Sequence, residues 1–468
     1  MSELPKTLGQ LRESGWVSRP VKEEVRENVI ARIRAGEPLF PGVVGYDETV
    51  LPQLENALLA GHDVIFLGER GQAKTRMIRS VTSLLDEYLP IVAGSEINDD
   101  PYHPVSKFAR ELVAEAGDET PIEWVHRDDR FGEKLATPDT SIADLIGEVD
   151  PIKVAEGRYL SDELTLHYGL VPRTNRGIFA INELPDLAER IQVGLLNVLE
   201  ERDVQVRGYK IRLPLDILLF ASANPEDYTN RGRIITPLKD RFGAQIRTHY
   251  PLDVATEVAI AVQEMRPLEA EGLRVAVPEY MAEIVATVSH LARRSAHINQ
   301  RSGVSVRLTI ANLETLVANA ARRALVHGET EVIPRIGDLD ALVSSTAGKV
   351  EIEAIEEGRD EQIIDHLLSS AVLTVFKHWC PMDKVRKVLE PFEQDLVVHV
   401  GEDVPSSDYV DLLSKVPALQ ETVKELAGAD ESPASVAAAI EFVLEGLHLS
   451  KRLNKDAVGG RAQYRGRG

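Results

Sequence analysis

A turn of eight residues between an apolar run and a helical pattern carries the clearest chemical signal in this sequence. It follows the apolar residues 64–67 and reads Gly68, Glu69, Arg70, Gly71, Gln72, Ala73, Lys74 and Thr75. Such a turn directs unpaired backbone N–H groups and the positive end of a helix at one point, so the pattern predicts a phosphate-binding loop. Lys74 would reach the terminal phosphates of a nucleotide, and Thr75 would ligate Mg²⁺. The alternative is an ordinary strand-to-helix turn that contains glycine.

One position departs from the pattern G-x-x-x-x-G-K-[ST]. Ala73 stands where this pattern has its second glycine. Its Cβ leaves less room for a phosphate beside the backbone, and it is unfavourable if the backbone there needs a positive φ.

A second polar site follows the apolar run 177–181. That run reads as a buried strand, and it delivers Asn182 and Glu183 at its carboxyl end, where ligands of open α/β sheets bind. Nucleotide hydrolases normally carry Asp-Glu there, because the aspartate orients Mg²⁺ through its water shell and the glutamate polarises the attacking water. Glu183 is therefore the candidate general base. Asn182 offers the metal an oxygen without a charge. A buried strand that happens to end in Asn-Glu is the alternative.

Two further polar residues are candidates for the same edge of the sheet. Asn224 follows the apolar run 217–221, and its amide could hydrogen-bond a γ-phosphate or position a water molecule. Arg241 ends a short helical segment, where an arginine can act on a phosphate bound by a neighbouring subunit. Both have simpler interpretations, because Asn-Pro is a turn former and Asp-Arg is commonly a surface ion pair.

The elements around these residues alternate between short apolar runs and helical stretches from residue 43 to about residue 251. The four runs 64–67, 177–181, 217–221 and 245–248 predict central strands of a parallel sheet with helices on both faces. Beyond residue 251 the strand signals nearly vanish. We therefore predict an N-terminal helical lead (1–40), an α/β nucleotide-binding core (41–251), a helical lid (252–349) and a C-terminal helical region with a basic tail (350–468).

Composition and charge limit the classes of function. The chain has 468 residues, and its formal net charge of −22 makes nucleic acid an unexpected partner. No run is long enough to insert into a membrane, no secretory signal is readable, and the single Cys380 excludes an internal disulfide, so we expect a cytoplasmic protein. Cys380 reads as a packed thiol. The basic stretch from Lys451 to Arg467 reads as a frayed tail, and Asp99 and Asp100 read as part of a solvated face.

The motifs in this order resemble those of the AAA+ ATPases, in particular the branch of MoxR and the magnesium chelatase I-like subunits. Arg307, at a predicted helix start, is similar to the second sensor of that branch, which reaches the nucleotide from the lid. The resemblance covers residues 41–350 and implies an AAA+ P-loop NTPase core with an all-α lid, followed by an extra C-terminal α-helical region. Further segments that support it are residues 43–47, 143–147 and 170–177 and a predicted hairpin over 204–211 with Gly208 near its turn.

The resemblance implies an ATP-binding and ATP-hydrolysing protein that uses Mg²⁺, self-associates into a ring, expected to be a hexamer, and remodels a partner protein. In such sites Asn224 senses the γ-phosphate, Arg241 acts from the next subunit and Arg307 reports on the lid. MoxR-like proteins commonly act with a von Willebrand factor A-type partner. The D-x-S-x-S metal site of that partner is absent from this sequence, so the partner would be another chain.

Two alternatives stay open. The chain could be the motor subunit of a magnesium chelatase, which inserts Mg²⁺ into a porphyrin, although the sequence shows no tetrapyrrole site. It could instead be a nucleotide switch or regulator with slow hydrolysis. Ala73 and Asn182 both bear on this choice, because they depart from the pattern at positions that contact the nucleotide.

Overall fold

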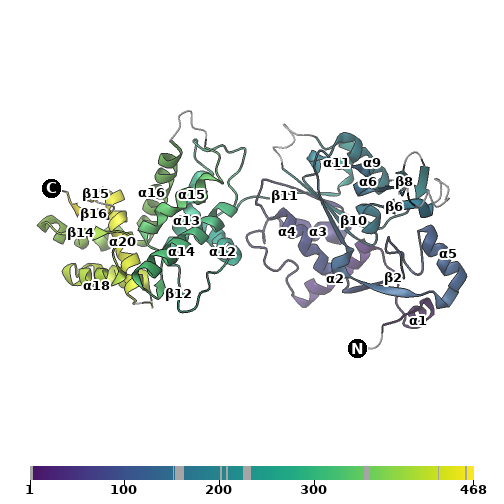
Figure 1. The fold of residues 1–468 in the computed structure, drawn as a ribbon, viewed down its shortest axis with the longest axis horizontal. Coiled ribbons are helices and arrows are strands. Elements are labelled where there is room, and N and C mark those ends of the chain that lie inside the picture. Colours follow the sequence, from purple (N-terminus) through teal and green to yellow (C-terminus); the bar gives the residue numbers. More distant parts are fainter. Residues whose placement is uncertain are drawn as a thin grey trace. The chain divides into compact units, whose positions relative to one another are not determined.

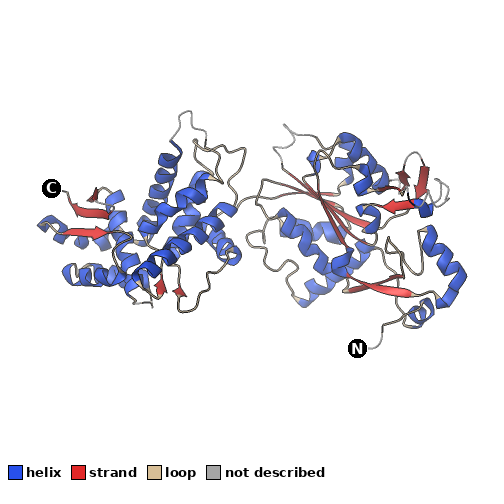
Figure 2. Ribbon diagram, in the orientation of Figure 1, coloured by secondary structure: helices blue, strands red, loops and turns tan. Residues whose placement is uncertain are grey.

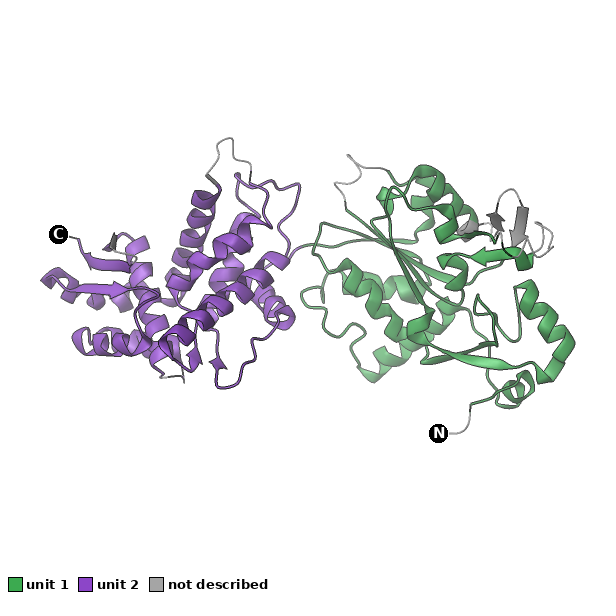
Figure 3. Ribbon diagram, in the orientation of Figure 1, with its two compact units in different colours: residues 1–249 green, residues 250–468 purple. Residues whose placement is uncertain are grey.

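The chain folds into two compact units, which are described separately: unit 1, Met1–His249, and unit 2, Tyr250–Gly468 (Figure 3). The computed structural model describes residues 4–150, 152, 163–200, 203–206, 209–224, 233–352, 359–428, 430, 432–458 and 461–467. Gly208, near the turn of the predicted hairpin, and residues 353–358 lie outside the described residues.

Unit 1 is built on a five-stranded sheet in which all neighbouring strands are parallel. The strand order is β11-β1-β10-β7-β4. The four strands predicted from apolar runs are present as β1 Val64–Leu67, β7 Gly177–Asn182, β10 Ile217–Ala223 and β11 Ala244–Arg247. The predicted central position is confirmed for β1, β7 and β10 and is wrong for β11, which lies at the edge of the sheet with only Ile246 buried. The fifth, β4 Phe131–Leu135, was not predicted.

Both faces of this sheet are buried, which is why its central strands read as continuous apolar runs. Successive side chains of a strand point to opposite faces. In β1, Val64 and Phe66 therefore pack with α2 Val21–Ala35, α3 Leu51–Ala60 and α4 Lys74–Ser80, whereas Ile65 packs with α6 Ile142–Leu145, α9 Glu189–Glu200 and α11 Thr236–Arg241. These two groups of helices lie on opposite sides of the sheet in Figure 1. The predicted arrangement of a parallel sheet between helices is confirmed.

The N-terminal lead is part of the packing of unit 1. Its helix α2 begins after Pro20 and ends at Gly36, whose left-handed backbone closes the last turn. Val21, Val25 and Val29 are buried in the same cluster as Phe66 of β1. The remaining elements of unit 1 are α1 Leu8–Glu13, α5 Lys107–Ala116, α8 Leu170–Arg173, β2 Tyr88–Val92, β3 Ile122–His126, β5 Gly147–Val149, β6 Leu166–Tyr168 and the predicted hairpin β8 Asp203–Val206 with β9 Tyr209–Arg212 (Figure 2).

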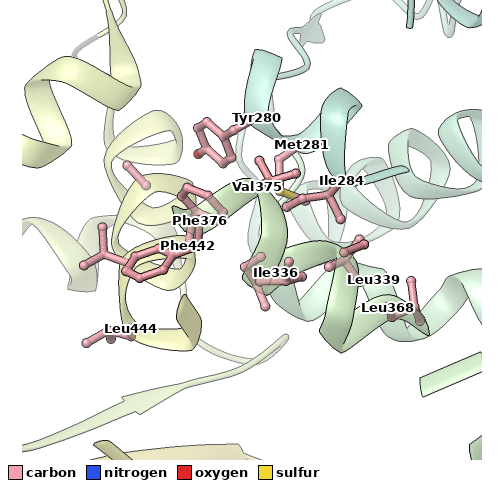
Figure 4. Packing of buried hydrophobic residues seen from close by; sticks show 14 of the residues in the cluster. Tyr280, Met281, Ile284, Ile336, Leu339, Leu368, Val375, Phe376, Phe442 and Leu444 are labelled. Carbon is pink, nitrogen blue, oxygen red and sulfur yellow. The ribbon is translucent and has the colours of Figure 1, made fainter. Parts of the chain in front are cut away.

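Unit 2 is mainly helical, and one hydrophobic cluster runs through it. Tyr280 of α13 (Glu279–Ala292) stacks on Phe442 of α20 (Pro433–Leu449), with ring centroids 4.4 Å apart. Phe376 of α16 (Arg359–Trp379) meets the same ring edge-on (Figure 4). Helix α13 belongs to the predicted lid, whereas α16 and α20 belong to the predicted C-terminal region. The two predicted parts therefore share a core. Cys380 is buried in it, and burial raises the pKa of its thiol to about 12.

The last helix of unit 2, α20, begins at a capping signal in the sequence. Ser432 caps α20 by accepting a hydrogen bond from the Ser435 backbone N–H, as its sequence predicts. The elements are α12 Val254–Glu264, α13 Glu279–Ala292, α14 Arg307–His327, α15 Leu342–Ala347, α16 Arg359–Trp379, α17 Met382–Val385, α18 Ser406–Lys415, α19 Leu419–Ala427, α20 Pro433–Leu449, β12 Arg274–Val275, β13 Glu331–Val332, β14 Val397–Val400, β15 Leu453–Val458 and β16 Arg461–Gly466.

The prediction of a frayed basic tail is wrong. Strands β15 and β16 pair antiparallel, and β14 pairs with β16 to complete a three-stranded sheet. Leu453 and Tyr464 anchor this sheet because both are buried. Basic side chains of the tail meet carboxylates of unit 2: Lys455 contacts Glu445, and Arg461 contacts Asp403.

The prediction of a solvated face at Asp99 and Asp100 is also wrong, because both are buried. Asp99 accepts hydrogen bonds from the backbone N–H groups of Val105 and Ser106, so it organises the loop before α5. None of the described helices combines the length and the apolar character needed to cross a bilayer.

Candidate functional site

The turn after β1 forms a tight loop whose backbone explains its residues. Gly71 has φ +75°, and Ala73, directly before α4, has φ +54°. The steric cost foreseen for an alanine at this position is therefore present. Gly68 is required for a different reason, because a Cβ there would lie 1.9 Å from Oγ1 of Thr248 on the neighbouring segment.

Lys74 folds back against the loop. Its Nζ donates hydrogen bonds to the carbonyl oxygens of Gly68 and Glu69, the latter at 2.8 Å, and its side chain is buried. A buried ammonium group favours an anion beside it, because little water is present to solvate the charge. The predicted phosphate-contacting residue is thus held at the loop itself.

The loop is braced from two sides by residues of unit 1. The Tyr46 hydroxyl lies 3.0 Å from the Gln72 carbonyl oxygen and 2.7 Å from that of His249. Burial is the main reason why the pKa of Tyr46 is raised to about 12, so the phenol stays protonated. The Thr248 hydroxyl donates to Oε1 of Gln72 at 2.6 Å. Tyr46 belongs to residues 43–47, one of the segments that carry the resemblance to the AAA+ ATPases.

A cavity of about 350 Å³ adjoins the loop. Gly68, Glu69 and Gln72 line it from the loop side. Two cations that the sequence analysis missed, Lys239 of α11 and Arg247 of β11, line it as well. Lys239 stands two residues before Arg241 in the sequence, but only the packing of α11 places it at the loop. The cavity therefore presents positive charge beyond Lys74.

The sheet brings the other predicted residues to the edge where the loop lies. Leu67 of β1 pairs with Ala223 of β10, so the next residues, Gly68 and Asn224, stand level with each other. The Gly68 N–H donates to the Ala223 carbonyl at 3.1 Å, and Asn224 is buried. Strand β7 pairs in parallel with β10, so Asn182 at the end of β7 lies on the same edge. The parallel sheet therefore brings the loop, Asn224 and Asn182 together.

Asn182 has partners on both neighbouring strands. Its Nδ2 donates to Oε1 of Glu133 on β4 at 2.5 Å, and its Oδ1 accepts from the Ser222 hydroxyl of β10 at 3.2 Å. Arg79 of α4 contacts Glu133 with two nitrogen atoms, at 2.7 and 3.2 Å. Glu133 was not predicted as a site residue, because the strand that carries it was not predicted either.

Glu183 follows Asn182 in a left-handed backbone conformation, with φ +55° and ψ +49°. This region is unfavourable for a glutamate, and residues held in it cluster at functional sites. The Glu183 N–H donates to the Ser222 hydroxyl at 3.2 Å, which ties this residue to the same network as Asn182. Its position at the sheet edge is the predicted one, and its role as a base stays a prediction.

The two predicted arginines occupy helix ends. Arg241 is the last residue of α11 in unit 1 and is exposed. Arg307 is the first residue of α14 in unit 2 and is also exposed. A buried carboxylate fixes the start of α14: Glu257 of α12 accepts hydrogen bonds from Arg293, directly after α13, and from Thr309 of α14. The roles of both arginines stay predictions.

The available donors fit Mg²⁺ better than a transition metal. No group of three or more His, Cys, Asp or Glu side chains within the described part of the chain could hold a metal ion by itself. Mg²⁺ needs fewer protein ligands, because it retains waters and binds substrate phosphates with one or two hard oxygen atoms from the protein. The Thr75 hydroxyl would be such a donor, and Asn182 and Glu133 add oxygen atoms at the same edge.

Sequence comparison finds relatives among magnesium chelatase subunits. The chain is 30% identical over 233 residues to magnesium-chelatase subunit ChlI of Nostoc sp., covering 48% of this chain and 58% of that protein. It is 29% identical over 247 residues to chloroplastic ChlI-1 of Arabidopsis thaliana, covering 48% and 52%. A match to ChlI of Nephroselmis olivacea, at 27% identity, covers 69% of this chain and 93% of that protein. The chain thus spans little more than half the length of the first two relatives. No protein-family model matches it.

Comparison of folds finds distant neighbours. A chain from the complex of BchI and BchD of magnesium chelatase aligns with a TM-score of 0.36 at 21% identity, covering 69% of this chain and 98% of that one. NtrX from Brucella abortus in complex with ATP aligns with a TM-score of 0.38 at 14% identity, covering 80% and 69%. Scores of this size carry no argument about function.

Proposed function

The chain is a relative of the AAA+ subunits of magnesium chelatase, and on this premise we propose that it binds and hydrolyses ATP. One observation supports the proposal most directly. The loop with Lys74, the pair Asn182 and Glu183, and Asn224 lie on one edge of a parallel sheet, although they are far apart in the sequence. This edge is where open α/β sheets bind their ligands.

In the proposed reaction a water oxygen attacks the γ-phosphorus, the bond from that phosphorus to the bridging oxygen breaks, and ADP and inorganic phosphate leave. Glu183 accepts the proton of the water, and Lys74 with the loop N–H groups orients the phosphates. Asn224 contacts the γ-phosphate. Thr75 and Asn182 would hold Mg²⁺, which would supply positive charge to offset that of the phosphates.

The proposed enzyme works as an assembly. Arg241 is exposed at the end of α11, as a residue that reaches a neighbouring subunit must be. We expect a ring, a hexamer by resemblance, in which Arg241 acts on the ATP of the next subunit and Arg307 couples the helical unit to the nucleotide. The ring would remodel a partner protein, with a separate von Willebrand factor A-type chain as the expected partner.

Two other functions have support of their own. The relatives found by sequence are named as magnesium chelatase subunits, which favours a motor for ATP-dependent metal insertion into a porphyrin. The uncharged Asn182 favours a switch that binds ATP and hydrolyses it slowly. The chelatase motor is tested by adding the separate chelatase subunits to an assay of porphyrin metallation. The switch is tested by measuring ATP turnover of the assembled protein.

The decisive experiment measures steady-state ATP turnover against protein concentration. We expect turnover to rise with assembly in the parent and to fall by about two to four orders of magnitude in Glu183→Gln. Arg241→Ala should bind ATP but lose about 10³ in turnover. Lys74→Ala should lose ATP binding itself.

Arg110→Ala is the matched control, because it removes an exposed cation of the same unit far from the loop in sequence. Equal losses in Arg110→Ala and Lys74→Ala would contradict the assignment of the loop. An assembled parent that binds ATP without turning it over would leave the switch as the function.

A further inference from the structure

The hydrogen-bond partners of Asn182 fix which end of its amide is the nitrogen and which is the oxygen. Glu133 can only accept a hydrogen bond when ionised, so the atom that faces it at 2.5 Å must be the amide Nδ2. The other end, Oδ1, then accepts from the Ser222 hydroxyl, which itself accepts from the Glu183 N–H. Asn182 thus donates a hydrogen bond that the Glu133 carboxylate on the next strand, β4, can accept.

Glu133 lies between this network and the helix that begins at the loop. Its strand β4 runs parallel to β7, with Glu133 opposite Ala180, so the side chain extends towards the carboxyl edge to reach Asn182. Arg79 binds it from α4. Because residues four apart share a face of a helix, Arg79 stands one turn below Thr75, the proposed metal ligand.

We infer that Glu133 supplies the acidic charge of the Mg²⁺ site, in place of the residue at the end of β7. The inference rests on the proposed function. Asn182 then transmits this charge, because the carboxylate polarises its amide and its Oδ1, which accepts one hydrogen bond from Ser222, has a second lone pair. Glu133 is a positioning residue that acts through Asn182. The negative charge of the site then lies on β4, the strand next to β7.

The substitution Asn182→Asp distinguishes a site charged by Glu133 from a site that lacks the usual aspartate at position 182 and has nothing in its place. Asn182→Asp would place a second carboxylate against Glu133 in van der Waals contact, and two carboxylates that close cannot both be ionised without a large penalty. Restoring the usual motif should therefore weaken the site. The pair Glu133→Gln with Asn182→Asp exchanges the amide and the carboxylate between strands and keeps one hydrogen bond between them.

The competing explanation is that Glu133 only fastens α4 to β4 through Arg79. In that case Glu133→Gln and Arg79→Met remove the same ion pair and should have the same effect. If Glu133 provides charge to the metal, the two differ, because Arg79→Met leaves the carboxylate in place and removes a competing cation.

The test measures the affinity of the full-length chain for a non-hydrolysable ATP analogue by titration calorimetry, once with Mg²⁺ and once with EDTA. Glu133→Gln and Asn182→Asp should each reduce the Mg²⁺-dependent gain in affinity about 10- to 100-fold, the usual effect of losing a partner of a metal ligand. Affinity in EDTA should not change. The double variant should recover most of the gain, and Arg79→Met should keep it.

The outcomes separate the two levels of inference. A parent that does not bind the analogue with or without Mg²⁺ overturns the proposed function, and this inference with it. A parent that binds, together with a Glu133→Gln variant whose Mg²⁺-dependent gain is unchanged, overturns only the role of Glu133. Equal losses in Glu133→Gln and Arg79→Met, or a double variant no better than the single ones, also overturn it in favour of the fastening role.

Discussion

Arg130 and Arg79 each bind a carboxylate through two hydrogen bonds. Arg130 directly precedes strand β4, whereas Arg79 lies on helix α4 and binds a carboxylate of β4 itself. Arg130 contacts Glu24 of α2 at 2.8 and 2.6 Å, and both side chains are sealed from solvent at 0% and 3% exposure. Arg79 contacts Glu133 with 63% and 19% exposure. The same chemistry therefore occurs in two environments within a few residues.

The difference lies in what else each pair contacts. Arg130 also donates to the Arg176 carbonyl, and Glu24 accepts from the Asp86 N–H, so the inner pair is saturated by protein groups. It joins the N-terminal lead to the sheet. The outer pair continues into Asn182 at the sheet edge. One pair organises packing, whereas the other holds a carboxylate against an asparagine at the sheet edge.

The largest expected effect tests this comparison directly. Arg130→Met leaves the Glu24 carboxylate buried without its counter-ion, which costs about 3 to 5 kcal/mol of unfolding free energy. The matched change Arg79→Met should cost at most about 1 kcal/mol, because the pair is exposed to solvent.

Urea titration followed by tryptophan fluorescence measures both. A Trp379→Phe background confines the signal to Trp16 and Trp124, which lie in unit 1. Similar losses in the two variants would show that burial does not separate the pairs.

The next effect concerns backbone strain at the sheet edge. Ala73 has φ +54°, where a side chain costs about 1 to 2 kcal/mol and glycine does not. Glycine also gains entropy in the unfolded chain, which offsets part of this. We expect Ala73→Gly to raise the unfolding free energy of unit 1 by about 0.5 to 1 kcal/mol. The same urea titration measures it, and a loss of stability would mean that the packing of the Ala73 methyl outweighs the strain.

The smallest effect is a pH dependence of the unfolding free energy that comes from Asp216, near the buried pair of Arg130 and Glu24. Asp216 accepts from the Val21 N–H at 2.7 Å, and burial raises its pKa above the ordinary value, although that N–H and Arg176 act in the opposite direction. A raised carboxyl pKa means that the stability from the neutral form is fully present below the unfolded pKa of about 4 and is lost as the pH rises through the folded pKa.

Asp216→Asn keeps an acceptor for Val21 and removes this titration. The unfolding free energy of Asp216→Asn should therefore rise relative to that of the parent as the pH increases above about 4. The difference between variant and parent is the quantity to measure, because the other carboxyl groups cancel in it. A constant difference across this range would show that Asp216 ionises as readily in the folded protein as in the unfolded one.

Strands β1, β7 and β10 could be predicted because each is apolar on both faces, and such runs stand out locally. The edge strand β11 was found from its sequence although only Ile246 of it is buried. The other edge strand, β4, could not be predicted, because its residues are at most partly buried and include Glu133 and Lys134. The C-terminal hairpin was missed for a related reason. Its residues are mostly polar, and only the burial of Leu453 and Tyr464 against unit 2 makes it an ordered sheet.

The division of the helical half also depended on long-range packing. Helix starts and ends were predictable from local signals such as the Ser432 cap. That Tyr280 and Phe442 belong to one core was not, because the sequence periodicity of a helix shows which face is buried and not which helix covers it.

The sequence by itself determined the phosphate-loop pattern and the polar residues that follow two apolar strands, and it placed them at one edge. The reason is that parallel strands end together, so residues directly after them meet whatever their separation in the chain. Only the tertiary structure decided that Lys239 and Arg247 line the cavity and that Glu133 faces Asn182. Those contacts depend on which strand neighbours which and how far a side chain reaches, and neither is encoded in local spacing.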